Sequence, residues 1–267
     1  MKYLDPITRL LYRRSPPRGA VMLMYHAVSA GARRPDWPWA VSQHRFREQL
    51  EFLASQGYAT PTLHELVAEP ERWSGRTAVI TFDDGYADNL TAYEELRAHG
   101  MRASWFIVTG SIGQPPRWQD TGYPAGRLLD ADALRTLHAT GMEIGSHTVS
   151  HLRLPQLVDT ALRRELSDSK SMLEDLLGAQ VNSFAYPYGA WDARCANATQ
   201  EAGYTAACTT RTGWALRDRD PFSLRRLTIY NTDSLSVFAR KLCYAANAVD
   251  WPTLIRQNFV SRFTRTT

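Results

Sequence analysis

Short apolar segments alternate with helix-like segments along almost all of this 267-residue chain. The apolar segments are rich in β-branched or aromatic residues, whereas the helix-like segments carry apolar residues three and four positions apart. We expect strands at residues 20–25, 58–60, 77–82, 102–108, 142–146, 181–186, 204–209 and 224–230. We expect helices at residues 43–56, 63–69, 88–98, 130–140, 158–177, 192–202 and 234–245. This alternation favours a parallel sheet with helices outside it.

The number of strand–helix units narrows the architecture further. About seven or eight such units in one α/β domain favour a (β/α) barrel, either closed or incomplete. The length and the 44% hydrophobic content are sufficient for one domain with a full core. We place that domain at residues 20–245, between a basic extension at 1–19 and a tail at 246–267. Residues 31–40 are rich in Gly, Pro, Trp and Arg and are expected to form a loop.

Charge and the termini exclude some classes of protein. The net charge of +4 is too small a basic excess to indicate a nucleic-acid partner. No apolar run reaches the length of about 18 residues that suggests a membrane-spanning helix. The N-terminus lacks the apolar core of a signal peptide, and the three cysteines form no CxxC pair. We therefore expect a cytoplasmic protein with reduced cysteines.

The basic extension at residues 1–19 interleaves apolar side chains such as Leu4, Ile7 and Leu10 with arginines. One interpretation is a solvated tail that folds onto the domain. The alternative is a peripheral contact with the anionic inner face of a membrane, where each basic residue contributes about 1 kcal/mol.

Chemically capable side chains follow the ends of several expected strands. They are His26, Asp83, Asp84, His147 and Tyr188. In a parallel barrel the C-terminal ends of all strands lie on one face, where active sites are built. A buried carboxylate without a partner costs several kcal/mol, so the Asp83-Asp84 pair calls for a chemical explanation. The simpler interpretation of Asp83-Asp84-Gly85 is an ordinary turn.

His147 and His151 are four residues apart, a spacing that would place both rings on one side of a helical turn within reach of one ion. An aspartate from the same face would complete a set of two His and one Asp, which leaves positions open for water and substrate. The second aspartate would then be available as a base on a water molecule whose pKa bound zinc lowers to about 7.

The substrate of such a site would be a carbonyl compound. A backbone N–H in the turn Pro187-Tyr188-Gly189 could stabilise the tetrahedral intermediate, although the same residues also suit a simple tight turn. Protonation of the leaving group needs an acid. No histidine follows His151, and His26 is the only other histidine at the end of an expected strand.

Three segments resemble the leading motifs of the polysaccharide deacetylase family, also called the NodB homology domain or carbohydrate esterase family 4. They are Thr81-Phe82-Asp83-Asp84-Gly85, Ser146-His147-Thr148-Val149-Ser150-His151 and Phe184-Ala185-Tyr186-Pro187-Tyr188-Gly189. The resemblance covers about residues 20–230 and implies a distorted (β/α)7 barrel, an incomplete TIM-type fold. It also implies metal-dependent removal of N-acetyl groups from amino sugars.

Roles for individual residues follow from the same resemblance. Asp83 is implied as the base, and Asp84, His147 and His151 are implied as the metal ligands. The backbone N–H of Tyr188 is implied in the oxyanion hole. The expected metal is Zn²⁺, with Co²⁺ or Ni²⁺ as alternatives.

Two departures from the usual family pattern point to a subgroup. Ala185 stands where most members carry an arginine that orients the base, and the late histidine that serves as acid is absent. The chain is similar to the biofilm poly-N-acetylglucosamine deacetylases, in which a first-strand Met-Tyr-His supplies the acid, here Met24-Tyr25-His26. In that subgroup a late arginine replaces the missing one. Arg226 matches it, and strand alternation alone cannot separate Arg226 from Arg225.

The substrate is expected to be an N-acetylated sugar or glycan. The missing signal peptide favours a lipid- or nucleotide-linked sugar in exopolysaccharide or lipopolysaccharide biosynthesis over an extracellular polymer. Several tryptophans in expected loops or near strand ends could stack on sugar rings or simply anchor the packing. They are Trp37, Trp39, Trp118, Trp191 and Trp214.

Three other functions compete with the deacetylase. The same residues could cleave a formamido sugar or another small amide, and an inactive homologue could bind sugars. Two His and one carboxylate also suit an Fe(II) oxygenase, although an adjacent second aspartate is not needed there.

Overall fold

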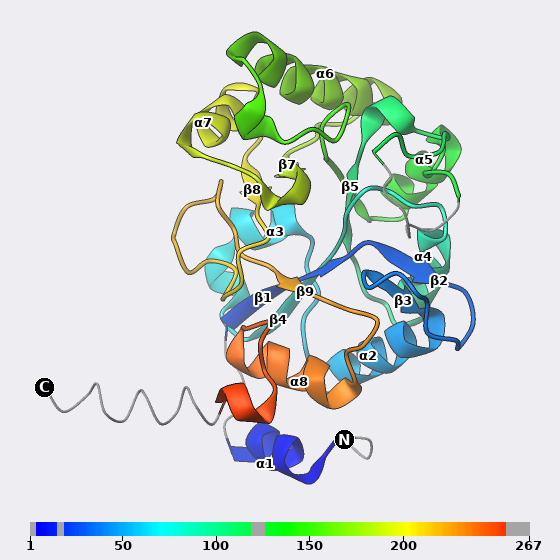
Figure 1. Cartoon of the computed structure of the whole chain (residues 1–267), viewed down its shortest axis with the longest axis vertical. Coiled ribbons are helices and arrows are strands. Elements are labelled where there is room, and N and C mark those ends of the chain that lie inside the picture. The colour runs from blue at the N-terminus through cyan, green and yellow to red at the C-terminus, as the bar shows by residue number, and fades with distance from the viewer. Residues whose placement is uncertain (1–3, 15–18, 119–125, 255–267) are drawn as a thin grey trace, which may run out of the picture.

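A parallel sheet of seven strands forms the centre of the computed structural model, which describes residues 4–14, 19–118 and 126–254 (Figure 1). The strand order is β8-β7-β6-β5-β4-β1-β9. The strands are β1 (Gly19–Tyr25), β4 (Arg76–Phe82), β5 (Ser104–Ile107), β6 (Glu143–Ser146), β7 (Ser183–Ala185), β8 (Ala206–Cys208) and β9 (Leu227–Thr228). The expected strand at 58–60 is reduced to a single bridge between Ala59 and Thr77.

Helices lie outside this sheet, as Figure 1 shows. They are α2 (Gln43–Ser55), α3 (Leu63–Ala68), α4 (Asn89–Ala98), α5 (Ala131–Ala139), α6 (Asp159–Leu177), α7 (Ala193–Glu201) and α8 (Leu235–Tyr244). Beyond β8, Leu224 bridges to Cys208, and β9 then pairs with β1 on the opposite edge. The sheet therefore curls towards closure. This arrangement confirms the expected incomplete (β/α)7 barrel.

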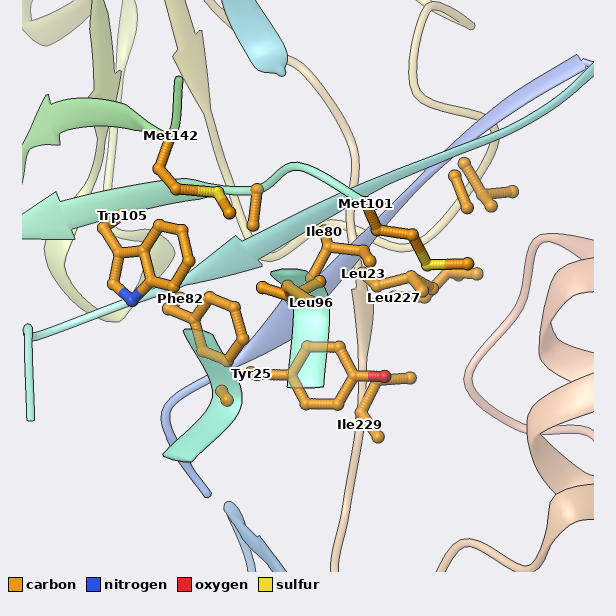
Figure 2. Packing of buried hydrophobic residues seen from close by; sticks show 14 of the residues in the cluster. Leu23, Tyr25, Ile80, Phe82, Leu96, Met101, Trp105, Met142, Leu227 and Ile229 are labelled. Atoms are coloured by element: carbon orange, nitrogen blue, oxygen red, sulfur yellow. The ribbon is translucent and has the colours of Figure 1, made fainter. Parts of the chain in front are cut away.

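The apolar segments form strands because both faces of the sheet are covered. Six consecutive residues of β4, from Thr77 to Phe82, are buried, which explains why this segment is almost continuously apolar. Figure 2 shows the rings of Phe82 and Trp105 side by side in the core, and their centroids are 4.8 Å apart. Such offset aromatic pairs contribute about 0.5–1.5 kcal/mol beyond the area they bury.

Capping residues set the helix starts. The side chain of Thr62 accepts a hydrogen bond from the backbone of Glu65, whose carboxylate accepts one from the backbone of Thr62. This reciprocal capping box satisfies two backbone donors at the start of α3. Asp130 and Ser234 cap α5 and α8 in the simpler way. The short polar residues in front of each apolar pattern thus mark the helix boundaries.

The N-terminal extension folds onto the domain, as one of its two interpretations expected, but it does so as a helix instead of a solvated tail. Residues of α1 (Pro6–Arg14) form a helix that packs beside α8, and Tyr12 donates a hydrogen bond to the Ala239 carbonyl at 2.9 Å. Asp5 pairs with Arg240 at 2.8 Å. Residues 1–3 and 15–18 lie outside the described residues, as does 255–267 of the expected C-terminal tail.

Two short strands were missed within and beside the expected loop. β2 (Ala27–Ser29) and β3 (Ala40–Ser42) pair in parallel and hold the two ends of that loop together. Three-residue strands leave too little periodicity to be detected in a sequence. In the part of the chain that the structure describes, no helix is long and apolar enough to cross a bilayer.

Candidate metal and catalytic site

The pairing of the strands brings the candidate residues to one pocket. Tyr25 of β1 is paired with Phe82 of β4, so His26 and Asp83 follow neighbouring strand ends. His147 follows β6 in the same way. The pocket has a volume of about 420 Å³, and six of the predicted residues line it. They are His26, Asp83, Asp84, His147, His151 and Tyr188.

Asp84, His147 and His151 form a compact set of ligand atoms. One nitrogen of each histidine and one oxygen of Asp84 all lie within 4.8 Å of one another. The Nε2 atoms of His151 and His147 are 3.3 and 3.5 Å from Asp84 Oδ1. That oxygen is buried and accepts no hydrogen bond of normal geometry from a described residue. An orphaned carboxylate oxygen between two imidazoles fits a divalent metal ion.

The protonation states of His147 and Asp84 also favour the binding of a cation. Burial lowers the pKa of His147 to about 4, so its imidazole is neutral and has a lone pair to offer. The ring Nδ1 lies 2.7 Å from the Ala185 carbonyl, which fixes the ring with Nε2 towards Asp84. Burial by itself would raise the pKa of Asp84, but the neighbouring histidines, His151 first, hold it well below its ordinary value.

The two histidines do not lie on a helical turn, so that prediction was wrong. Thr148 and His151 have left-handed backbones with φ of 71° and 58°, and the segment between them is a loop. The carboxylate of Glu165 on α6 accepts hydrogen bonds from the backbone N–H groups of Val149 and Ser150, both at 2.9 Å. The rings converge because the loop folds back on itself.

Asp83 is held by a buried arginine. The two terminal nitrogens of Arg226 donate to the two carboxylate oxygens of Asp83 at 2.6 and 2.7 Å. Arg226 is 0% exposed, and its Nε donates to the Thr209 carbonyl at 2.9 Å. Burial raises the pKa of Asp83, but the guanidinium outweighs burial and leaves that pKa below its ordinary value. Arg225 instead pairs with Asp218, so of these two arginines it is Arg226 that contacts Asp83.

His26 lies on the pocket wall beside two tryptophans. Its ring centroid is 5.7 Å from that of Trp37 and 6.3 Å from that of Trp39. Burial lowers the pKa of His26, while the carboxylates of Asp84 and Asp83 act in the opposite direction. Its Nδ1 atom is buried and has no hydrogen-bond partner among the described residues.

The turn after β7 carries a strained residue. Tyr188 has φ of 60° and ψ of 8°, and its ring centroid lies 4.5 Å from that of His151. Gly189 follows with φ of 66°, and a Cβ atom there would lie 2.1 Å from Thr210 Oγ1. Only glycine fits at that position.

Comparison with known proteins agrees with this geometry. Residues 71–207 match the family model described as polysaccharide deacetylase. A Bacillus subtilis relative named as a polysaccharide deacetylase, YxkH, is 30% identical over 226 residues, which is 83% of this chain and 75% of the relative. The chain belongs to the polysaccharide deacetylase family. It is therefore an enzyme of the polysaccharide deacetylase type, which is consistent with carbohydrate N-deacetylation.

Other relatives extend the comparison. The Staphylococcus aureus protein named poly-beta-1,6-N-acetyl-D-glucosamine N-deacetylase is 23% identical over 210 residues, 69% of each chain. The solved structure of IcaB from Ammonifex degensii superposes with a TM-score of 0.70 at 22% identity, covering 86% of this chain and 98% of that one. At this identity the superposition supports the fold alone.

Sequence reasoning missed part of the pocket wall of this family member. Tyr230, Asn247, Arg153 and Thr210 also line the pocket. Tyr230 ends the expected strand at 224–230, so the strand-end rule that found His147 could have found it. Of the loop tryptophans, Trp37 and Trp39 line the pocket, whereas Trp191 stacks on Tyr186 and Trp214 packs against Gly19.

A buried ion pair between Lys241 and Asp233 lies next to Tyr230 of the pocket wall. Lys241 on α8 is 1% exposed and donates to Asp233 at 2.5 Å and to the Thr228 carbonyl at 2.7 Å. Its ammonium also lies 4.8 Å from the centre of the Tyr230 ring. Asn231 then donates to the Trp37 carbonyl at 3.1 Å. The pair therefore connects α8 to the aromatic side of the pocket.

Lys241→Met is expected to lower the free energy of unfolding by about 3–5 kcal/mol, because it leaves the buried Asp233 carboxylate without its cation. Urea denaturation of both proteins measures the difference. The double variant Lys241→Met/Asp233→Asn should be less destabilised than the sum of the two single variants. A loss below about 1 kcal/mol for Lys241→Met would contradict the role assigned to the pair.

Proposed function

We propose that this protein removes N-acetyl groups from an acetamido sugar of a polysaccharide or of its lipid- or nucleotide-linked precursor. The observation that carries the proposal is the Asp84, His147 and His151 set beside the Asp83–Arg226 pair in one pocket. The named activity of the Staphylococcus aureus relative supports the same chemistry. Trp39 and Tyr230 add aromatic faces of the kind on which sugar rings stack.

Asp84, His147 and His151 would hold the metal. Two imidazoles and one carboxylate suit Zn²⁺, with Co²⁺ or Ni²⁺ as alternatives. An ion held there would lower the pKa of a water molecule and polarise the amide carbonyl. Since three protein ligands leave coordination positions open, both water and substrate can reach the site.

Asp83 takes the proton from the attacking water in this proposal. Arg226 holds both carboxylate oxygens, so the base is ionised and fixed in direction before the substrate binds. His26 donates a proton to the leaving amine. Burial lowers the pKa of His26, and the two nearby aspartates oppose that shift without cancelling it. The backbone N–H of Tyr188 donates to the oxyanion.

The test is acetate release from a panel of N-acetylated sugars that are free, polymeric or lipid-linked. We expect acetate with zinc present, none after treatment with a chelator, and recovery when zinc is added back. Formate release from a formamido sugar, without acetate from any acetamido sugar, would replace the deacetylase with a deformylase. Stoichiometric metal binding without either product would point to a sugar-binding role.

A further inference from the structure

Arg153 places a positive charge on the wall of the catalytic pocket. It is the one lysine or arginine among the described residues that line this pocket. The ion pairs of the described residues include none from Arg153. The other charged groups of the pocket already have partners, since Asp83 is paired with Arg226 and Asp84 faces two histidines. The guanidinium therefore has its donors available to a ligand.

The main chain at this arginine is fixed. Leu154 is fully buried beside it. The side chain of Arg194 donates to the carbonyls of Leu157 and Pro155 at 2.9 and 3.1 Å, which anchors the following turn. The backbone that carries the exposed Arg153 side chain is therefore already ordered. Binding of a ligand by this side chain would cost little further backbone entropy.

Aromatic contacts link Arg153 to the metal ligands. Its guanidinium carbon lies 4.1 Å from the centre of the Tyr188 ring. The same ring lies 4.5 Å from the ring of His151. Tyr188 is 41% exposed, so the pair forms part of the accessible wall. A substrate bound at Asp84, His147 and His151 would be separated from Arg153 by about the width of the Tyr188 ring.

We propose that Arg153 is a specificity-determining residue that recognises an anionic group on the substrate. The group is a carboxylate or a phosphate, carried by the acetamido sugar itself or by the unit next to it. A guanidinium matches the planar pair of oxygens that both groups offer. This inference rests on the proposed function, because it assigns the substrate class of the same site.

A purely structural role for Arg153 makes a different prediction. If the arginine only packed on Tyr188, its removal would affect neutral and anionic ligands alike. If it recognises an anion, its removal changes the ratio of the two affinities. Exposed charge pairs are also screened by salt, so the preference for the anionic ligand should decrease as ionic strength rises.

The experiment uses zinc-loaded full-length protein and three probes. N,N′-Diacetylchitobiose is neutral, N-acetylglucosamine 1-phosphate carries a phosphate, and a disaccharide of N-acetylglucosamine and glucuronic acid carries a carboxylate. Binding is measured by calorimetry in the Asp83→Asn background, so that turnover does not interfere. Acetate release from the same probes is measured with the Asp83 protein.

We expect an anionic probe to bind more tightly than the neutral one and Arg153→Gln to reduce that preference about tenfold. Arg153→Lys should restore part of it, since it keeps the charge but loses the fork of donors. Arg164→Gln on α6 makes the same change in net charge outside the pocket and should leave the preference as it is. The better of the two anionic probes distinguishes phosphate from carboxylate.

Two results would overturn the inference: wild-type preference for the neutral probe, or an equal effect of Arg153→Gln on all probes. Absence of binding by every probe would count against it as well. Failure of the proposed function looks different, because then no probe releases acetate although the Arg153-dependent binding preference persists.

Discussion

Asp83→Asn is expected to lower the rate of amide hydrolysis by about 10²–10⁴-fold while the protein keeps its metal. Asparagine has nearly the same shape as aspartate, and its carbonyl oxygen can still accept a hydrogen bond from Arg226. Its amide cannot take a proton from water. The three side chains that would hold the metal are unchanged. Acetate release and metal content, both measured on the purified variant, check the two halves of this expectation.

His147→Ala is the matched control for that experiment. It removes an imidazole from the set with Asp84 and His151, so both metal content and activity should fall. Near-normal activity in Asp83→Asn would show that Asp83 is not the base. Loss of metal in Asp83→Asn would show that the two aspartates do not divide their roles as proposed.

Arg226→Met is expected to lower the free energy of unfolding by about 3–5 kcal/mol. Asp83 is 3% exposed, and both of its oxygens bond to Arg226. Without the arginine, an ionised carboxylate would remain buried with no counter-charge. Urea denaturation measures the loss, and the double variant Asp83→Asn/Arg226→Met should recover part of it because both charges are removed.

The neighbouring arginine provides the control for this substitution. Arg225 pairs with Asp218 nearer the surface, so Arg225→Met should cost about 1 kcal/mol or less. Arg226→Lys preserves the charge and keeps the test informative if the methionine variant does not fold. If Arg225→Met and Arg226→Met lowered the free energy of unfolding equally, the buried Asp83–Arg226 pair would contribute no more to stability than the more exposed Arg225–Asp218 pair.

The sequence was sufficient for the architecture and for the face on which the site lies. Strand periodicity and capping are local properties, so β4 and α3 could be located within a few residues. The strand-end rule then brought His26, Asp83 and His147 to one pocket. These features depend on neighbours in the sequence, which is why they could be predicted.

Features that depend on distant parts of the chain were harder to predict. The α1 helix lies outside the expected domain because its partners are far away in sequence; the Asp5 amide, for example, bonds to Ser236. Alternation could not separate Arg225 from Arg226, because β9 begins only at Leu227 and both arginines precede it. The direction of Arg226 is set by hydrogen bonds to residues just beyond β8, since its Nε donates to the Thr209 carbonyl and its backbone N–H to the Arg211 carbonyl.

The four left-handed residues at the site have a consequence for protein engineering. Of six described non-glycine residues with positive φ, four belong to these loops: Asp84, Thr148, His151 and Tyr188. Each such conformation costs about 1–3 kcal/mol, which the surrounding fold must offset. Transplanting only the side chains of Asp84, His147 and His151 onto a new scaffold would therefore fail. The transferable unit is the set of bent loops, together with the strand ends that hold them in shape.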